Sequence, residues 1–390
     1  MRDGFQIMDA DRHVMEPLSM WAEYLPSHLR DETPRMLPFS TDPEPFSARL
    51  ERLGEFALLP TPPVLGLAGK PVMRNLSEAA HIEVGLAAER RWHLAKAAET
   101  PKGHLADMDE NGIDAAVLLP TLASYLVFND ELEPEVSRAY ARAYNRWLSH
   151  FCAAAPLRLF GAALISRHDA QAMTSDLEEA IRSGARAVVV RPNPVKGQTL
   201  SAPSYARFWA ACEHHSIGVL LHEGCHARLA TTGADRFQTH FAQHACSHPL
   251  EAMMALLALI EGGILEKHPR LRVGLLESGC GWLPYWLWRL DHVEYARLTG
   301  ELRARVRMPP SQYFRRQCWI AMEPSEALLA PAIADIGPSR VLFGSDFPHP
   351  DHSIAIVDDV LSLRHTLGEA VVRDILWQNP RQLMGIDTDR

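Results

Sequence analysis

The sequence has few cysteines, and no two of them stand close enough to form a CxxC pair. The six are scattered along the chain, at Cys152, Cys212, Cys225, Cys246, Cys280 and Cys318. Disulfide-rich proteins show closely patterned cysteines, so this scatter indicates reduced thiols. We therefore expect a cytoplasmic protein.

Long hydrophobic runs are also absent. The longest apolar stretch, Met253–Ile260, is interrupted by Glu261 after eight residues, whereas a membrane-spanning helix needs roughly 20. The first residues, Met1–Gly4, lead into a polar motif without the apolar core of a signal peptide. The sequence predicts neither a membrane partner nor a secretion signal.

An excess of basic charge is missing as well. The chain carries 48 acidic against 39 basic residues, a net charge of -9, and the basic residues form no stripe. This balance argues against a nucleic-acid partner. With 390 residues, 47% of them hydrophobic, the chain can instead bury a large core.

Short apolar runs alternate with longer amphipathic stretches, a pattern typical of repeated βα units around a parallel sheet. Eight such units predict a (β/α)8 TIM barrel, and we expect residues 1–390 to form a single metal-dependent barrel domain. The predicted strands are Phe5–Asp9, Ala115–Leu119, Leu159–Ile165, Ala187–Val190, Val219–His222, Val273–Glu277, Cys318–Met322 and Val341–Gly344.

The segment 14–102 departs from this alternation because it is rich in proline. We interpret it as an insertion after the first strand that is helical in part. Active sites of this fold lie at the carboxyl ends of the strands. At this position the insertion would cover the mouth of the barrel as a lid, a substrate wall or a contact between subunits.

The run Asp9-Ala10-Asp11-Arg12-His13 places two acids and a histidine at the end of the first apolar segment. Alternate side chains of a strand point to the same face, so Asp9, Asp11 and His13 are predicted to project together. Carboxylate oxygen and imidazole nitrogen suit Mn, Fe or Zn. The run is half of a metal site.

The other half comes from the ends of three later strands, where apolar sequence gives way to polar residues. His222 follows Val219–Leu221, Glu277 follows Gly274–Leu276, and Asp346 stands just beyond the last predicted strand. All three are plausible metal ligands at the mouth of a barrel.

Five segments together resemble the amidohydrolase superfamily, in the branch of aminocarboxymuconate-semialdehyde decarboxylase and related aromatic-acid decarboxylases. Their order and spacing are specific, and they span nearly the whole chain. The segments are Ile7–His13 (IMDADRH), His104–Asp114 (HLADMDENGID), His222, His268–Val273 (HPRLRV) with Glu277-Ser278-Gly279, and Phe343–His349 (FGSDFPH).

The resemblance implies a divalent metal ion and assigns roles to the residues at the strand ends. By it, Asp11 and His13 take the place of the ligand pair on the first strand. His222 takes the place of the histidine on the fifth strand, and Asp346 that of the aspartate on the eighth. Asp9 matches an aspartate that lies beside the ligands.

Two positions depart from the pattern of the superfamily. Glu277 stands where many members carry a histidine, and Val188–Pro192 (VVVRP) lacks the lysine that bridges two metals in dinuclear hydrolases. With two ions, a carboxylate would have to bridge them, and Glu277 is the best-placed candidate. Such a carboxylate-rich pair is typical of iron that activates oxygen.

Histidines recur every four residues at His240, His244 and His248, which places them on one face of a helix. His248 or His244 could supply nitrogen to a second ion. His349 and Trp282 are further candidates for contact with ligands or substrate. His352, beside Asp351, could likewise touch substrate or simply lie in a loop.

Each candidate also has a purely structural interpretation. Asp9, Asp11 and His13 could form a solvated turn, and His222 could be a core histidine. Asp346 could cap a helix, Glu277 could pair with Arg272 or Arg289, and the histidine face could be solvated.

We favour an enzyme whose catalytic groups are His222, Glu277 and Asp346. The metal ligands would be Asp11, His13, His222, Glu277, Asp346 and His248. The preferred hypothesis is a dinuclear non-haem iron monooxygenase that uses molecular oxygen to hydroxylate an apolar, terpenoid-like small molecule. The alternative is a mononuclear Zn or Mn hydrolase, or a non-oxidative decarboxylase of an aromatic or unsaturated acid. A metal-free scaffold is the third hypothesis, and the resemblance further implies a homo-oligomer.

Overall fold

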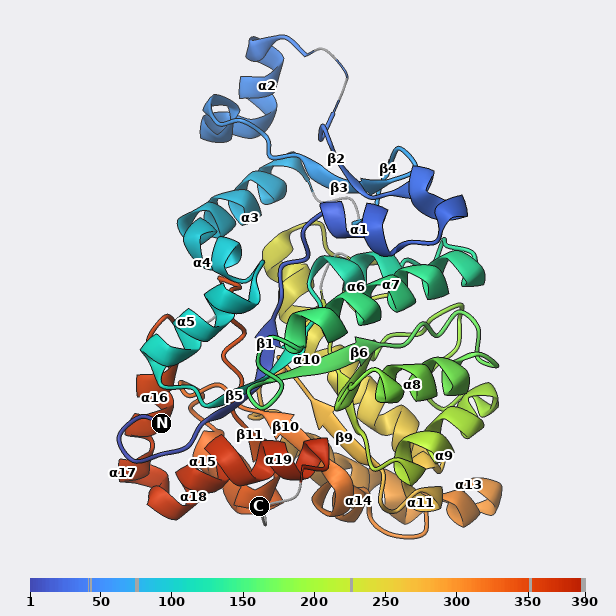
Figure 1. The fold of residues 1–390 in the computed structure, drawn as a ribbon. Helices are drawn as coiled ribbons and strands as arrows, with labels where there is room; N and C mark the ends of the chain where they lie inside the picture. Colours follow the sequence, from blue (N-terminus) through green and yellow to red (C-terminus); the bar gives the residue numbers. More distant parts are fainter. Residues whose placement is uncertain (41, 43, 74–76, 225–226, 351–352, 387–390) are drawn as a thin grey trace.

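Eight buried parallel strands form a ring in which every strand pairs with its neighbours in chain order (Figure 1). The structure is a computed structural model that describes residues 1–390 except 41, 43, 74–76, 225–226, 351–352 and 387–390. The strands are β1 (Met8–His13), β5 (Ala115–Leu119), β6 (Leu159–Leu164), β7 (Ala187–Val190), β8 (Gly218–Leu221), β9 (Arg272–Leu275), β10 (Cys318–Ala321) and β11 (Val341–Leu342).

The ring closes between its first and last strands. The Ala10 N–H donates to the Phe343 carbonyl at 3.0 Å, and Arg12 forms a parallel bridge with Phe347 just beyond β11. The predicted (β/α)8 barrel is therefore confirmed. All eight predicted strands are present, because continuous apolar runs are what a strand buried on both faces requires.

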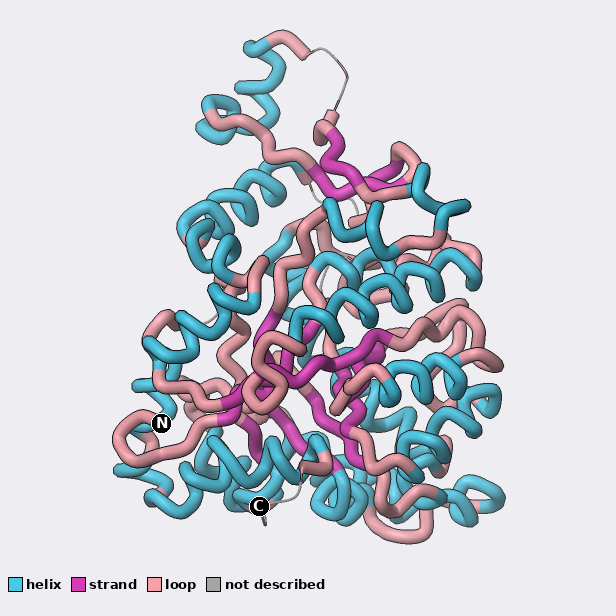
Figure 2. The backbone as a smooth tube through the Cα atoms, viewed as in Figure 1, coloured by secondary structure: helices cyan, strands magenta, loops and turns pink. Residues whose placement is uncertain are grey.

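Helices surround the strands, as the tube view in Figure 2 shows. No helix in the described part of the chain is both long and apolar enough to span a membrane. Those after β5 are α6 (Leu122–Val127), α7 (Pro134–Cys152), α8 (Met173–Arg182), α9 (Ala206–His214), α10 (His240–Glu261), α11 (Ile264–Lys267), α12 (Leu283–Arg289), α13 (Gly300–Arg305), α14 (Pro310–Gln317), α15 (Leu329–Ile336), α16 (Ile356–Ser362), α17 (Arg364–Leu367), α18 (Glu369–Arg373) and α19 (Asn379–Met384).

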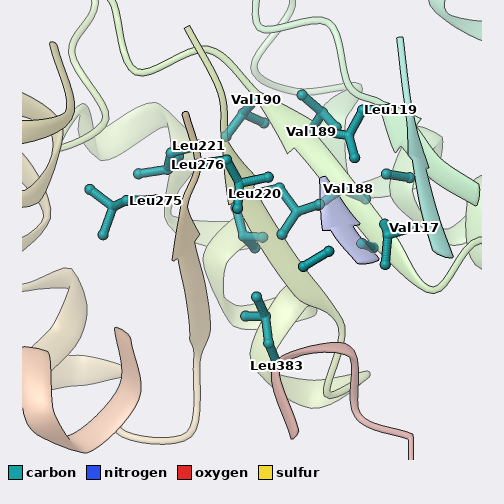
Figure 3. Packing of buried hydrophobic residues seen from close by; sticks show 14 of the residues in the cluster. Val117, Leu119, Val188, Val189, Val190, Leu220, Leu221, Leu275, Leu276 and Leu383 are labelled. Atoms are coloured by element: carbon teal, nitrogen blue, oxygen red, sulfur yellow. The ribbon is translucent and has the colours of Figure 1, made fainter. Parts of the chain in front are cut away.

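Branched aliphatic side chains pack around the barrel strands (Figure 3), and α19, which contacts β1, β9 and β11, lies at the lower end of the barrel (Figure 1). Two glycines allow this helix to come close. A Cβ on Gly218 would lie 2.8 Å from the Leu383 carbonyl oxygen, and one on Gly274 would lie 2.8 Å from a methyl of Leu383. The strands thus lack side chains where the last helix packs against them.

The first strand begins later than predicted. It runs over Met8–His13 rather than Phe5–Asp9, and Phe5 instead forms a bridge with Arg2. The polar run stays in the strand because its buried polar groups find partners across the barrel, which hydrophobicity alone does not reveal. Pairing with β5 shifts register between Asp9 and Arg12.

Between β1 and β5 the chain forms short helices and a three-stranded antiparallel sheet. In Figure 1 this segment lies above the carboxyl ends of the barrel strands. Arg228 donates to the Pro71 carbonyl at 2.8 Å, and Arg91 donates to the His349 carbonyl at 2.6 Å. The elements are α1 (Ser19–Tyr24), β2 (Arg35–Leu37), α2 (Phe46–Leu53), β3 (Val64–Leu67), β4 (Lys70–Pro71), α3 (Glu78–Arg90), α4 (Trp92–Ala97) and α5 (Pro101–Asn111).

Candidate metal centre

Four predicted ligands lie together at the carboxyl ends of the strands, with three of them around the Nε2 atom of the fourth, His13. His13 Nε2 lies 3.1 Å from His222 Nε2, 3.3 Å from Asp11 Oδ1 and 3.4 Å from Asp346 Oδ1. All four residues are buried, and they come from β1 and from the segments that follow β8 and β11. The structure brings together residues that are more than 300 positions apart in the sequence.

The orientation of His13 leaves this nitrogen available. Its other ring nitrogen, Nδ1, lies 2.9 Å from the Pro120 carbonyl oxygen. A carbonyl only accepts, so Nδ1 carries the proton and Nε2 keeps a lone pair directed at the cluster. Metal-binding histidines are commonly held in this way.

Two of the carboxylates stand on unusual backbone. Glu277 has φ +47° and Asp346 has φ +50°, in the left-handed region that side-chain-bearing residues rarely adopt. Such a conformation costs about 1–3 kcal/mol and persists where the surrounding structure demands it. The fold therefore accepts strain to direct both carboxylates into the mouth of the barrel.

Asp9 does not join the cluster. Its carboxylate accepts hydrogen bonds from the Ser345 N–H, at 2.9 Å, and from the Ser345 hydroxyl, and it lies 3.6 Å from the Arg12 guanidinium. Asp9 thus fastens β1 to the segment that carries Asp346. The strand alternation predicts that Asp9, Asp11 and His13 project together, but Asp9 is not in the group of ligand atoms formed by Asp11, His13 and His222. Its place beside the ligands is the one that the resemblance implies, and the pairing of β1 with β5 is irregular between Asp9 and Arg12.

His349 continues the cluster outward from Asp346. His349 Nδ1 lies 2.7 Å from Asp346 Oδ1, and His349 Nε2 lies 3.1 Å from Thr121 Oγ1. Thr121 precedes α6, and the Glu16 carboxylate accepts backbone N–H bonds at the start of that helix. Neither Thr121 nor Glu16 was predicted as a site residue, although Thr121 follows the end of β5 and the rule that polar residues at strand ends form the site applies to it.

Glu277 faces imidazoles rather than arginines. Its Oε2 lies 3.0 Å from His222 Nε2, and its Oε1 lies 3.4 Å from His248 Nδ1. Arg289 pairs with Glu294 at 3.0 Å, and Arg272 donates to the Ser216 carbonyl at 2.9 Å. The proposed arginine pairing of Glu277 is therefore wrong.

The other candidates have more ordinary surroundings. Trp282 is half-buried, and its indole N–H donates to the Ser278 carbonyl at 3.0 Å, so the structure gives it a packing position. The cap interpretation of Asp346 is wrong because the next helix, α16, begins only at Ile356. Asp351, His352 and Cys225 lie outside the described residues, whereas the described cysteines are free thiols.

The electrostatics of the cluster fit a cation. Burial raises the pKa of Asp11 well above its ordinary value, and Asp346 and Glu277 add to the effect. Burial also lowers the pKa of His13 well below its usual range. Asp11 Oδ1 accepts no hydrogen bond from the described residues. Crowded carboxylates beside imidazole nitrogens are the donor set of a divalent transition ion.

A sequence profile described as amidohydrolase matches residues 9–386. The chain belongs to the amidohydrolase family. The resemblance inferred from the five segments is confirmed, and the family together with the donor set indicates a metal-dependent enzyme.

Similar members of this family are decarboxylases. Gamma-resorcylate decarboxylase of a Rhizobium species is 28% identical over 262 residues, which are 62% of this chain and 74% of the relative. The 2-amino-3-carboxymuconate-6-semialdehyde decarboxylase of Dictyostelium discoideum is 21% identical over 294 residues, 74% of this chain and 78% of the relative.

A solved structure shares the fold over almost the whole chain. It is a 5-carboxyvanillate decarboxylase of Novosphingobium aromaticivorans with bound manganese, with a TM-score of 0.70 and 16% identity over 98% of each chain. These relatives support the decarboxylase alternative of the sequence analysis. They give no support to the preference for iron and monooxygenation.

Proposed function

We propose that this protein is a divalent-metal-dependent decarboxylase that acts without oxygen on an aromatic or unsaturated carboxylic acid. One observation carries the proposal: His222, Asp11 and Asp346 place donor atoms within 3.1–3.4 Å of His13 Nε2. The decarboxylases among its relatives supply the reaction class.

Asp11, His13, His222 and Asp346 would hold the ion. Manganese, which the related 5-carboxyvanillate decarboxylase binds, suits this mixed set of oxygen and nitrogen donors, and zinc does so too. When bound, such an ion orients the carboxylate and a neighbouring oxygen of the substrate and polarises them. The insertion 14–102 would act as the lid that keeps water from this mouth.

The protein's own groups would manage the proton. Decarboxylation breaks the bond between the substrate carbon and its carboxylate, releases carbon dioxide and leaves that carbon to be protonated. Asp346 Oδ1 and His349 Nδ1, which are 2.7 Å apart, would hold this proton and deliver it to the carbon. Thr121 Oγ1, 3.1 Å from His349 Nε2, would keep the imidazole in place.

The test is an anaerobic assay with Mn²⁺-loaded protein and a panel of hydroxybenzoates that begins with 2,6-dihydroxybenzoate, the ligand of a related decarboxylase. We expect carbon dioxide release without oxygen, and a loss of about 100-fold or more in Asp346→Asn, because Asp346 would both bind the ion and hold the proton, and general acid groups alone contribute about 10²–10⁴-fold. The matched control is Asp109→Asn, an exposed aspartate far from the mouth. Oxygen uptake with a hydroxylated product, and no carbon dioxide, would instead favour the monooxygenase.

A further inference from the structure

We infer that the chain has a second site for a divalent transition-metal ion, formed by His244, His248 and Glu277. The inference is independent of the reaction under "Proposed function" and rests only on the geometry beside the first site. Each of the three residues offers one ligand atom, and these atoms lie within 4.8 Å of one another.

The two histidines come from one face of α10. They stand one helical turn apart, and their ring centroids are 4.8 Å apart. His248 is buried and His244 is half-buried, so the pair leads from the inside of the barrel mouth toward its surface. Two imidazoles on adjacent turns form a preformed pair of nitrogen ligands, as in helical zinc motifs.

Glu277 is oriented to join this pair to the first site. His248 Nδ1 lies 3.0 Å from the Glu277 carbonyl oxygen and 3.4 Å from Glu277 Oε1, so Nδ1 carries the proton and Nε2 is the nitrogen left to bind an ion. Glu277 Oε2 faces His222 Nε2 at 3.0 Å. One carboxylate thus presents one oxygen to each group of histidines. The strained backbone of Glu277, at φ +47°, maintains this direction.

No side chain at the end of β7 can serve as a ligand that bridges the two ions. Arg191 stands there, and its guanidinium donates to the His222 carbonyl at 3.3 Å and to Ser124 Oγ at 3.1 Å. Its positive charge opposes a cation, so a bridging ligand must come from another strand. Glu277, beyond β9, is the carboxylate that faces both groups.

The donor set determines the class of ion. Two imidazoles and one carboxylate favour borderline ions such as Fe²⁺, Co²⁺, Mn²⁺ or Zn²⁺ over Mg²⁺ or Ca²⁺, which prefer oxygen ligands. Three protein ligands leave further positions open for water or substrate. The second ion would therefore lie within reach of whatever the first ion binds.

Titration of metal-free protein with Co²⁺ tests the inference by stoichiometry. We expect wild-type protein to retain two ions per chain after desalting, measured by elemental analysis and by visible absorption. His244→Ala/His248→Ala should retain one. His240→Ala is the matched control, because it removes an imidazole of the same helix face outside the group of three ligands, and it should retain two.

One ion per chain in wild-type protein, or two in the double variant, would overturn the inference. If the double variant does not fold by circular dichroism, the single variant His244→Ala replaces it. Its second ion should bind roughly tenfold or more weakly, since losing even an outer partner of a ligand costs 10–100-fold. Unchanged affinity would count against the site.

The two proposals fail in different ways. Two bound ions without carbon dioxide release would contradict the decarboxylase and leave the second site standing. One bound ion with carbon dioxide release would do the reverse. His13→Ala separates the sites further, since it should lose the first ion and keep the one held by α10.

Discussion

Single residues at the mouth of the barrel combine burial with charge. His222 is an example, since burial lowers its pKa while Asp11 and Glu277 raise it, and the balance leaves its pKa raised. His248 shows the opposite balance, because burial dominates and lowers its pKa. Burial and the neighbouring carboxylates together thus shift the pKa values of these two imidazoles in opposite directions.

Individual ligands could be predicted from the sequence because each ends an apolar run. His222 after Val219–Leu221 and Glu277 after Gly274–Leu276 required only the rule that barrels place polar groups at strand ends. The direction of Asp9 could not be predicted, because it depends on pairing with Ser345 across the ring. Long-range partners leave no periodic signal in the sequence.

Glu16 should make the free energy of unfolding depend on pH. Burial raises its pKa to about 7, although the backbone N–H groups of Thr121, Leu122 and Ala123 oppose the rise. Because the pKa of Glu16 in the folded protein exceeds its ordinary value of 4.5, the folded state binds more protons than the unfolded state between these two values. The free energy of unfolding therefore falls as the pH rises from 4.5 through about 7. Glu16→Gln should remove that loss.

Urea unfolding of both proteins from pH 5 to 8 measures the effect. The unfolding free energy of wild type relative to Glu16→Gln should fall with rising pH, by at most about 1.4 kcal/mol per pH unit. A difference that stays constant with pH would mean that Glu16 is ionised throughout, held by the start of α6.

The bounds of strands could be predicted well from the sequence where every residue of the strand is buried. The bounds of β5 and β7 match the prediction, since both strands are apolar throughout. β1 was misplaced because polar residues occupy its end, and β11 is only two residues long. The helical face of His240, His244 and His248 was predicted, and α10 begins at His240.

The packing of α19 against the barrel can be tested at Gly274, which lies against Leu383. Gly274→Ala should destabilise the protein by about 1–3 kcal/mol, because the new methyl would press on Leu383. In a Leu383→Ala background the same change should cost less, since the obstructing methyl is gone. Thermal unfolding of the four proteins gives the coupling, and equal costs in both backgrounds would contradict the contact.

The whole molecule should gain stability from its ion. An ion that binds only folded protein stabilises it by about 2.7 kcal/mol at 100 times its dissociation constant. Removing metal with a chelator should therefore lower the melting temperature, and Mn²⁺ should restore it. The triple variant His13→Ala/His244→Ala/His248→Ala, which lacks ligands of both sites, is the control, because a loss of similar size in that variant would show that the chelator acts elsewhere.

The seam between β1 and the segment after β11 has a consequence for biosynthesis. Asp9 and Ser345, which fasten this seam, are 336 positions apart, and the ligands Asp11 and Asp346 lie beside them. A growing chain on the ribosome therefore displays His13 long before it displays Asp346. The complete set of ligands therefore reaches its final geometry only after Asp346 has been synthesised and the ring has closed.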